Sequence, residues 1–196
     1  MSKKEELQQL QLHNHEICTC VLKKTATQPV FGDGNPESNI IFIGEAPGKK
    51  EDIEGKPFVG SSGKFLAEML ATIGMKREDI YITNTVKYRP PENRDPLPKE
   101  KEECKKWLYE ELTFIKPKLI VFLGRHAMNT FFPDLKISDA HGKLIEKTFT
   151  DFPDTTHFLA LYHPAAALYN GGMRETLIKD FKKIPKILQK IKTIKK

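Results

Sequence analysis

Four short apolar runs constrain the fold of this chain most strongly, and helical patterns separate them along the sequence. The runs cover residues 40–43, 80–83, 119–123 and 157–161. Strands of four or five apolar residues that alternate with helices indicate a parallel sheet covered on both faces. The sequence therefore predicts an α/β protein with three α/β/α layers around a central, mainly parallel four-stranded sheet.

The intervals between these runs carry the helical patterns. We expect helices over residues 5–16, 64–73, 99–114, 125–131 and 174–194, and an edge hairpin around 143–149. No internal repeat or domain boundary is visible, and 196 residues are enough for one domain that buries roughly 70% of its unfolded surface. We therefore expect residues 1–196 to form a single domain.

Charge and hydropathy limit the classes of function. The net charge is +6, but residues 179–196 alone carry eight lysines and one aspartate, so the rest of the chain is close to neutral. This lysine-rich terminal helix could bind phosphates or form a solvated face. No apolar run approaches the roughly 20 residues of a membrane span, and the N-terminus lacks the apolar core of a signal peptide. We expect a cytoplasmic protein.

A glycine-rich loop, GEAPGKKEDIEGKPFVGSSG, follows the first apolar run. It holds five glycines and two prolines in twenty residues, which is typical of a shaped loop where backbone approaches a ligand. The spacing of its glycines and lysines does not match a nucleotide phosphate loop. Two other polar segments, ITNTVKYRPP and LYHPAA, also end expected strands. Open α/β sheets bind ligands at this edge.

Four motifs, in order, carry a resemblance to a known family. GEAPG, GKPFVGSSGKFL, YITNTVKYRPPENRDP and LYHPAAAL resemble the successive signatures of the family-4 uracil-DNA glycosylases, from about Cys20 to Asp180. The resemblance implies a monomeric α/β/α enzyme. Its expected substrate is uracil-containing DNA, from which it would remove uracil by hydrolysing the N-glycosidic bond.

The resemblance implies a pocket for a uracil that has left the base stack. Gly44 and Ala46 would form its floor, and Phe58 would offer the aromatic face on which the base stacks. Asn84 ends the second apolar run. Its amide can accept from uracil N3–H and donate to O4, whereas cytosine presents the opposite pattern.

His163 and Glu45 are the expected catalytic residues. His163 can donate a hydrogen bond to the uracil as negative charge grows near O2, together with backbone N–H groups of the Glu45–Ala46 turn. Better-known uracil glycosylases have a water-activating aspartate where Ala46 stands here. Glu45 or Asn93 is expected to position the water, or Glu45 only shapes the pocket. His126 is interpreted as an ordinary helix residue.

The loop after His163 is expected to enter the DNA minor groove. Leu168 is the candidate wedge that fills the gap left by the flipped base. Tyr169 stands where relatives often have a basic residue. Lys64, Arg89 and Arg94 border the loops and are the expected phosphate contacts.

The cysteines depart from the family pattern. The resemblance implies a [4Fe–4S] cluster on four cysteines, and Cys20 and Cys104 match two of them. Cys18 is one place from the expected first ligand, and Tyr88 stands where the third belongs. A phenol is a poor substitute for a thiolate. We therefore expect that the cluster is lost. The odd number of cysteines also argues against a disulfide framework.

Three alternatives stay open at this point. His13 or His15 could join the cysteines in a zinc site or a modified cluster. The chain could be a catalytically weakened DNA- or nucleotide-binding relative, as the departures at Ala46, Tyr88 and Tyr169 suggest. It could also be an unrelated α/β ligand-binding protein that reproduces the four motifs by chance.

Overall fold

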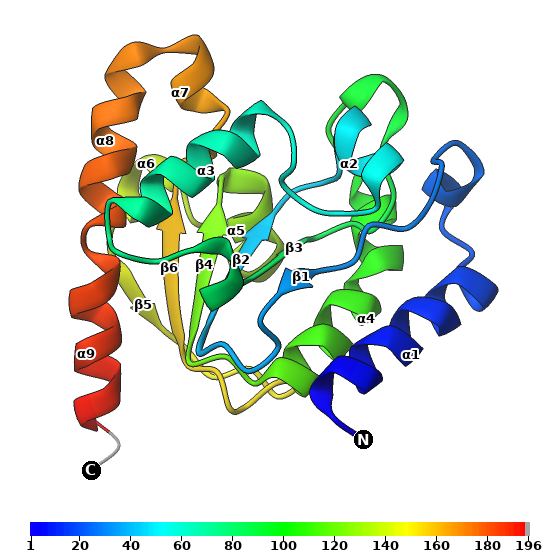
Figure 1. Ribbon diagram of the computed structural model, residues 1–196, viewed down its shortest axis with the longest axis horizontal. Coiled ribbons are helices and arrows are strands. Elements are labelled where there is room, and N and C mark those ends of the chain that lie inside the picture. The colour runs from blue at the N-terminus through cyan, green and yellow to red at the C-terminus, as the bar shows by residue number, and fades with distance from the viewer. Residues whose placement is uncertain (195–196) are drawn as a thin grey trace.

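Helices and strands alternate along the chain in a computed structural model that describes residues 1–194 (Figure 1). The strands are β1 (Asp33–Gly34), β2 (Ile40–Gly44), β3 (Tyr81–Asn84), β4 (Leu119–Leu123), β5 (Leu144–Glu146) and β6 (His157–Leu161). The α-helices are α1 (Lys3–Ile17), α2 (Lys49–Glu54), α3 (Ser61–Ala71), α4 (Pro98–Ile115), α5 (Arg125–Phe131), α6 (Ile137–Ala140), α7 (Ala166–Tyr169), α8 (Gly171–Phe181) and α9 (Ile184–Ile194). Short 3₁₀ helices are η1 (Val21–Lys24), η2 (Arg77–Asp79) and η3 (Pro91–Asn93).

The sheet confirms the expected fold class and adds two strands to it. Its order is β1-β3-β2-β4-β6-β5, and the four expected strands are the parallel ones in the middle. The additional strands, β1 and β5, pair antiparallel at the two edges, so the sheet has six strands rather than four in the described part of the chain. The segment around 143–149 is not a hairpin by itself, because β5 pairs with β6.

Apolar side chains on both faces of the sheet form two separate cores. Ile40 and Phe42 of β2 belong to the core under α3, α8 and α9, whereas Ile41 and Ile43 belong to the core under α4 and α5. Successive strand residues point to opposite faces, so an unbroken apolar run needs helices on both sides. A third, smaller core lies between α1 and α4 and contains the three cysteines.

The expected terminal helix over 174–194 is two helices. α8 ends at Phe181 and α9 begins at Ile184. Pro185 explains the break, because proline lacks an N–H and disfavours helical geometry in the residue before it, yet it is tolerated in a first turn. α9 runs away from the edge where α2 and α7 lie (Figure 1). The last two residues of the lysine-rich segment lie outside the described part.

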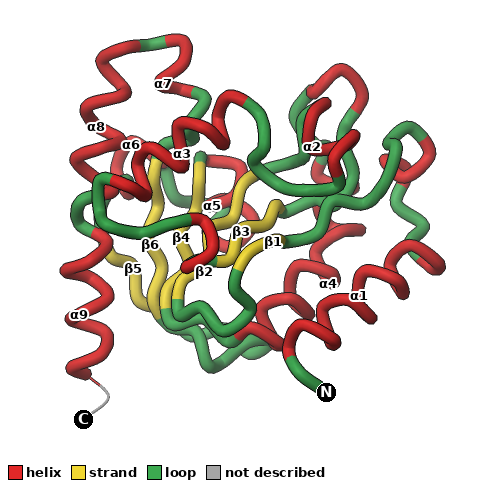
Figure 2. Tube along the Cα trace, viewed as in Figure 1, coloured by secondary structure: helices red, strands yellow, loops and turns green. Residues whose placement is uncertain are grey.

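The carboxyl ends of the parallel strands open into long loops, drawn green in Figure 2. β3 lies on one side of β2, and β4 and β6 lie on the other, so the chain reverses direction across the sheet between β2 and β4. Ligands of open α/β sheets bind in the crevice outside such a point. No helix among the described residues is long and apolar enough to cross a membrane.

Candidate active site

A small pocket lies at this edge, formed by loops after β2, β3 and β6. Its volume is about 140 Å³. That is well below the roughly 300–1,000 Å³ of drug-sized or cofactor sites, so it suits one small ring. The residues that line it are Ala46, Gly48, Glu51, Phe58, Ser62, Asn84 and His163. The structure therefore gathers most of the expected uracil-binding residues in one place.

Phe58 is held in the pocket by unusual backbone geometry. Its φ of 54° lies in the left-handed region, which a bulky residue seldom adopts. Glycines make the placement feasible. A Cβ on Gly63 would lie 1.9 Å from the Phe58 carbonyl oxygen, and one on Gly44 would lie 2.6 Å from the Phe58 ring. Arg77 Nη1 donates to the Phe58 carbonyl at 2.8 Å. The ring is 7% exposed and its centroid lies 5.9 Å from that of His163.

Asn84 faces Gly44 in the parallel register of β3 and β2. It is 2% exposed, and its Oδ1 has no hydrogen-bond partner among the described residues. A buried acceptor without a partner costs free energy and points to a ligand that satisfies it. The Asn84 backbone carbonyl accepts from Lys87 Nζ at 2.9 Å. Asn84 therefore presents a fixed, unpaired amide oxygen at the pocket.

His163 is neutral in this setting. The Ala165 backbone N–H donates to its Nδ1 at 3.1 Å, so the ring proton lies on Nε2. Burial lowers the pKa of His163 to about 4, with a smaller contribution from His126. Gly124, at φ 98°, lets the backbone after β4 approach, since a Cβ there would lie 3.0 Å from the His163 Cβ. The site thus holds a neutral imidazole whose Nε2–H has no acceptor in the described part of the chain.

Glu45 lies beside the pocket, and the structure corrects the interpretation of His126. Burial raises the pKa of Glu45 to about 7, and the nearby Asp95 carboxylate adds to the shift. Glu45 Oε1 lies 3.5 Å from His126 Nδ1, and His126 Nε2 lies 3.0 Å from Asp95 Oδ2. His126 is therefore not an ordinary helix residue but part of the surroundings of Glu45.

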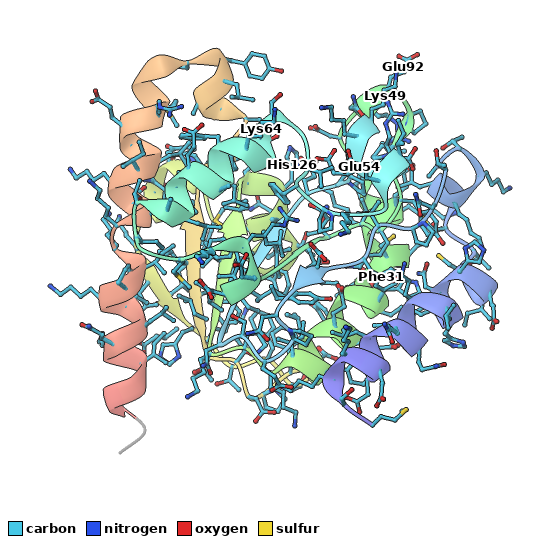
Figure 3. All side chains as sticks on the ribbon, in the orientation of Figure 1. Phe31, Lys49, Glu54, Lys64, Glu92 and His126 are labelled. Atoms are coloured by element: carbon cyan, nitrogen blue, oxygen red, sulfur yellow. The ribbon has the colours of Figure 1, made fainter. Side chains whose placement is uncertain are left out.

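The expected wedge lies on the rim. Leu168 is 47% exposed and Tyr169 is 91% exposed, both on α7 just after the His163 loop. Lys64 is also exposed at this edge, in the first turn of α3 (Figure 3). Leu168 and Lys64 stay predictions for the contact with DNA.

The loop before α4 uses its polar groups internally. Arg89 Nε donates to Asn93 Oδ1 at 2.7 Å, and Asn93 is not among the residues that line the pocket. Arg94 donates two hydrogen bonds to the Glu100 carboxylate, at 2.6 and 2.8 Å. The amide oxygen of Asn93 is therefore occupied by Arg89, and Arg94 is tied to the start of α4.

The cysteine cluster has the packing of a small core. Cys18, Cys20 and Cys104 are buried free thiols, and the Sγ atoms of Cys20 and Cys104 lie 3.8 Å apart. Tyr88, 1% exposed, fills the same cluster and its hydroxyl donates to Asn14 Oδ1 at 2.8 Å. The donor set is three thiols and a phenol already hydrogen-bonded elsewhere. It does not fit a four-thiolate iron–sulfur cluster.

Among residues 1–194, the two nearby histidines do not form a close group of possible metal ligands with these thiols. His13 is exposed and its ring meets the Trp107 edge, with centroids 5.9 Å apart, and His15 is exposed. Among the described residues, one group of three side chains has possible metal-ligand atoms close together: Glu45, Asp95 and His126. This group contains no thiol.

Two further residues that shape the site carried no clear signal in the sequence. Glu51 of α2 accepts from the Val59 and Gly60 N–H groups at 3.0 and 2.8 Å, which fixes the start of α3 beside the pocket. Lys87 is fully buried in an ion pair with Glu111. Glu51 sits in a polar stretch without apolar periodicity, and Lys87 reads as an ordinary basic residue in a loop.

Comparison with known proteins agrees with the fold class. Residues 31–192 match the Uracil DNA glycosylase superfamily. The chain belongs to this superfamily. Among curated relatives it is similar to the type-4 uracil-DNA glycosylase of Archaeoglobus fulgidus, 48% identical over 87% of each chain. It is similar also to those of Sulfurisphaera tokodaii, 44% identical over 84% of this chain and 77% of the relative, and Thermotoga maritima, 35% identical over 97% and 99%. The resemblance to family 4 is thus confirmed.

Proposed function

We propose that this protein is a DNA repair glycosylase that flips uracil out of DNA and hydrolyses its N-glycosidic bond, leaving an abasic site. One observation carries the proposal. A small pocket at the carboxyl edge of the sheet joins an aromatic ring, an unpaired buried amide oxygen and a neutral imidazole with a free N–H. Membership in the uracil-DNA glycosylase superfamily and the type-4 relatives support the same reaction.

Recognition of uracil would come from Phe58 and Asn84. The flipped base stacks on the Phe58 ring, which is worth roughly 1–3 kcal/mol per base in similar contacts. Asn84 Oδ1 accepts from uracil N3–H, and the amide N–H₂ donates to O4. Cytosine has an acceptor at N3 and a donor at N4, so it would leave the buried Asn84 oxygen unpaired. Sites of this kind discriminate strongly.

His163 would stabilise the leaving uracil. As the C1′–N1 bond breaks, its electron pair moves onto the uracil ring and charge develops at O2. The His163 Nε2–H donates a hydrogen bond there without transferring its proton, since the ring is neutral and its pKa lies near 4. A donor fixed in advance in a site of low polarity is most effective when charge appears.

Glu45 is the residue that we favour for positioning the attacking water and accepting its proton. The water oxygen bonds to C1′ and its proton passes to the Glu45 carboxylate. With a pKa of about 7, Glu45 is ionised in part at neutral pH and can accept that proton. Asn93 is the less favoured candidate because its side-chain oxygen already accepts a hydrogen bond from Arg89 Nε.

Excision assays test the proposal. The wild-type protein should release uracil from single- and double-stranded oligonucleotides and leave cytosine intact. His163→Ala and Asn84→Ala should each slow excision, the first by roughly 100- to 1,000-fold, as for removal of one oxyanion donor. His157→Ala, at the opposite end of β6, is the matched control. Binding of uracil-containing DNA without any abasic product at stoichiometric enzyme would instead indicate the catalytically weakened relative.

Contact with DNA would come from the rim. Leu168 is the proposed wedge, and Lys64 and Arg89 the proposed phosphate contacts, with Arg94 a weaker one because of its pairing with Glu100. We also infer that the enzyme acts as a monomer, because the pocket and its rim come from one chain. A stable dimer in solution whose activity needs both copies would contradict that inference.

We further propose that packing replaces the iron–sulfur cluster in this protein. The support is the buried Tyr88–Asn14 hydrogen bond and the contact of Cys20 with Cys104 within one apolar cluster. Iron, sulfide and zinc analysis of purified protein, with its visible absorption spectrum, tests this. Protein made with iron and sulfide supplied should contain far less than one cluster per chain. One cluster or one zinc ion per active chain would refute the proposal.

A further inference from the structure

His126 connects the buried carboxyl group of Glu45 with the surface. It lies in the first turn of α5, directly after β4. Its Nδ1 faces Glu45 Oε1 at 3.5 Å, and its Nε2 faces Asp95 Oδ2 at 3.0 Å. The Glu45 side chain is 20% exposed, that of His126 is 25% exposed and that of Asp95 is 63% exposed. The three side chains form a continuous row from the pocket to solvent.

Positively charged side chains surround this row of residues. Lys101 Nζ, from α4, lies 3.3 Å from His126 Nδ1, and Arg125 Nε donates to His126 Nε2 at 3.1 Å. His163 faces the same space from the end of β6. Burial lowers the pKa of His126, and Lys101 lowers it further, while Asp95 raises it. Two cationic side chains at the same ring nitrogens argue against a metal ion, although the three ligand types lie within reach of one.

We propose that His126 is a positioning residue that carries a proton from Glu45 to Asp95 during uracil excision. The inference rests on the proposed function. When the water oxygen bonds to C1′, the water proton passes to Glu45. Glu45 then gives it to His126 Nδ1 in the tautomer whose ring proton lies on Nε2, and that Nε2 proton passes to Asp95, 3.0 Å away, and to solvent. This step requires Arg125, which donates to Nε2 in the structure, to release that nitrogen. The uracil anion takes the electron pair of the broken C1′–N1 bond, so atoms and charge balance.

The surroundings of Glu45 explain why it needs such an outlet. Its Oε1 is buried and makes no hydrogen bond among the described residues. A buried carboxyl group holds its proton more tightly than an exposed one, so at neutral pH a large share of the Glu45 groups would still hold the proton received from water. His126 offers the adjacent acceptor, and Asp95 beyond it is open to solvent. The outlet would return Glu45 to the ionised form before the next turnover.

Single-turnover and multiple-turnover excision across a range of pH test this inference. His126→Gln keeps a polar side chain of similar reach but cannot relay a proton. We expect its multiple-turnover rate near neutral pH to fall by roughly tenfold or more, a modest part of the usual effect of acid–base groups. The deficit should shrink as pH rises, because Glu45 then loses its proton directly to solvent. The single-turnover rate should change less.

Asp95→Asn is the second variant, and its exposed position leaves folding unaffected. It should shift the pH profile in the same direction as His126→Gln. His157→Gln, at the far end of the sheet, is the control and should match the wild type. A rate loss that is equal at every pH, or an unchanged profile in both variants of an active enzyme, overturns the inference alone. A wild type without any uracil excision overturns the proposed function as well.

Discussion

Lys87 offers the sharpest test of how the pocket is held in place. Its Nζ forms an ion pair with Glu111 and donates to Thr83 Oγ1 at 2.8 Å and to the Asn84 carbonyl at 2.9 Å. Both charged side chains are fully buried. Lys87→Met keeps much of the volume of the side chain but removes its charge. Glu111 would keep hydrogen bonds from Tyr81 and Thr83 and lose its counter-charge.

The expected cost follows from that burial. Removing one partner of a buried ion pair costs about 3–5 kcal/mol, because the other charge stays uncompensated. For a chain of this size, each kcal/mol lowers the melting temperature by about 2–4 °C, so Lys87→Met should lower it by roughly 6–20 °C. Uracil binding should also weaken, since Asn84 loses the donor that holds its carbonyl.

Urea unfolding followed by the fluorescence of Trp107, the single tryptophan, measures the effect. Lys105→Met is the matched control, because Lys105 pairs with Glu102 on the exposed side of α4 and should cost less than about 1 kcal/mol. Adding Glu111→Gln to Lys87→Met should recover part of the loss. If the free energy of unfolding of Lys87→Met lies within about 1 kcal/mol of that of the wild type, the reasoning from burial is refuted.

Four further outcomes are expected. Gly44→Ala should abolish excision with little loss of folding, because the added Cβ would lie within 3 Å of both the Phe58 ring and the Asn84 amide oxygen. Excision assays and circular dichroism measure the two effects. Leu168→Ala should slow excision from double-stranded more than from single-stranded oligonucleotides, since only the duplex must be unstacked. Tyr88→Phe should cost about 1–2 kcal/mol in urea unfolding, because Asn14 Oδ1 loses its donor. His163→Gln should remove a pH dependence of the free energy of unfolding. The pKa of His163 is about 4 in the folded protein and near 6.5 in the unfolded chain, so the wild type should lose stability relative to the variant as pH falls from 6.5 to 4.

The sequence placed the parallel strands well because their signal is local. β4 and β6 have the expected bounds, and α5 begins and ends where its pattern indicates. Unbroken apolar runs followed by glycine or proline specify a buried strand with little help from the rest of the chain. β1 could not be found this way, because Asp33 and Gly34 have no strand character and are held by pairing with β3.

The same distinction separates the site residues. Asn84 and His163 stand at the ends of apolar runs, so their position in the pocket follows from the strands that precede them. Lys87 and His126 acquire their roles from partners far along the chain, Glu111 and Glu45. A histidine or lysine in a polar stretch is usually exposed, and nothing in its neighbours reveals a distant carboxylate. Such tertiary contacts are where reasoning from a single sequence fails.

The opposite pKa shifts of Glu45 and His163 have one physical origin. Burial disfavours charge, so it raises the pKa of the carboxyl group to about 7 and lowers that of the imidazole to about 4. The pocket therefore keeps His163 neutral and leaves Glu45 only partly ionised near neutral pH, so the uracil anion meets a fixed N–H dipole rather than a mobile ion. A site that disfavours charge must also remove the proton that the water leaves behind. The path from Glu45 through His126 to exposed Asp95 meets that need, which joins the catalytic proposal and the relay in a single physical requirement.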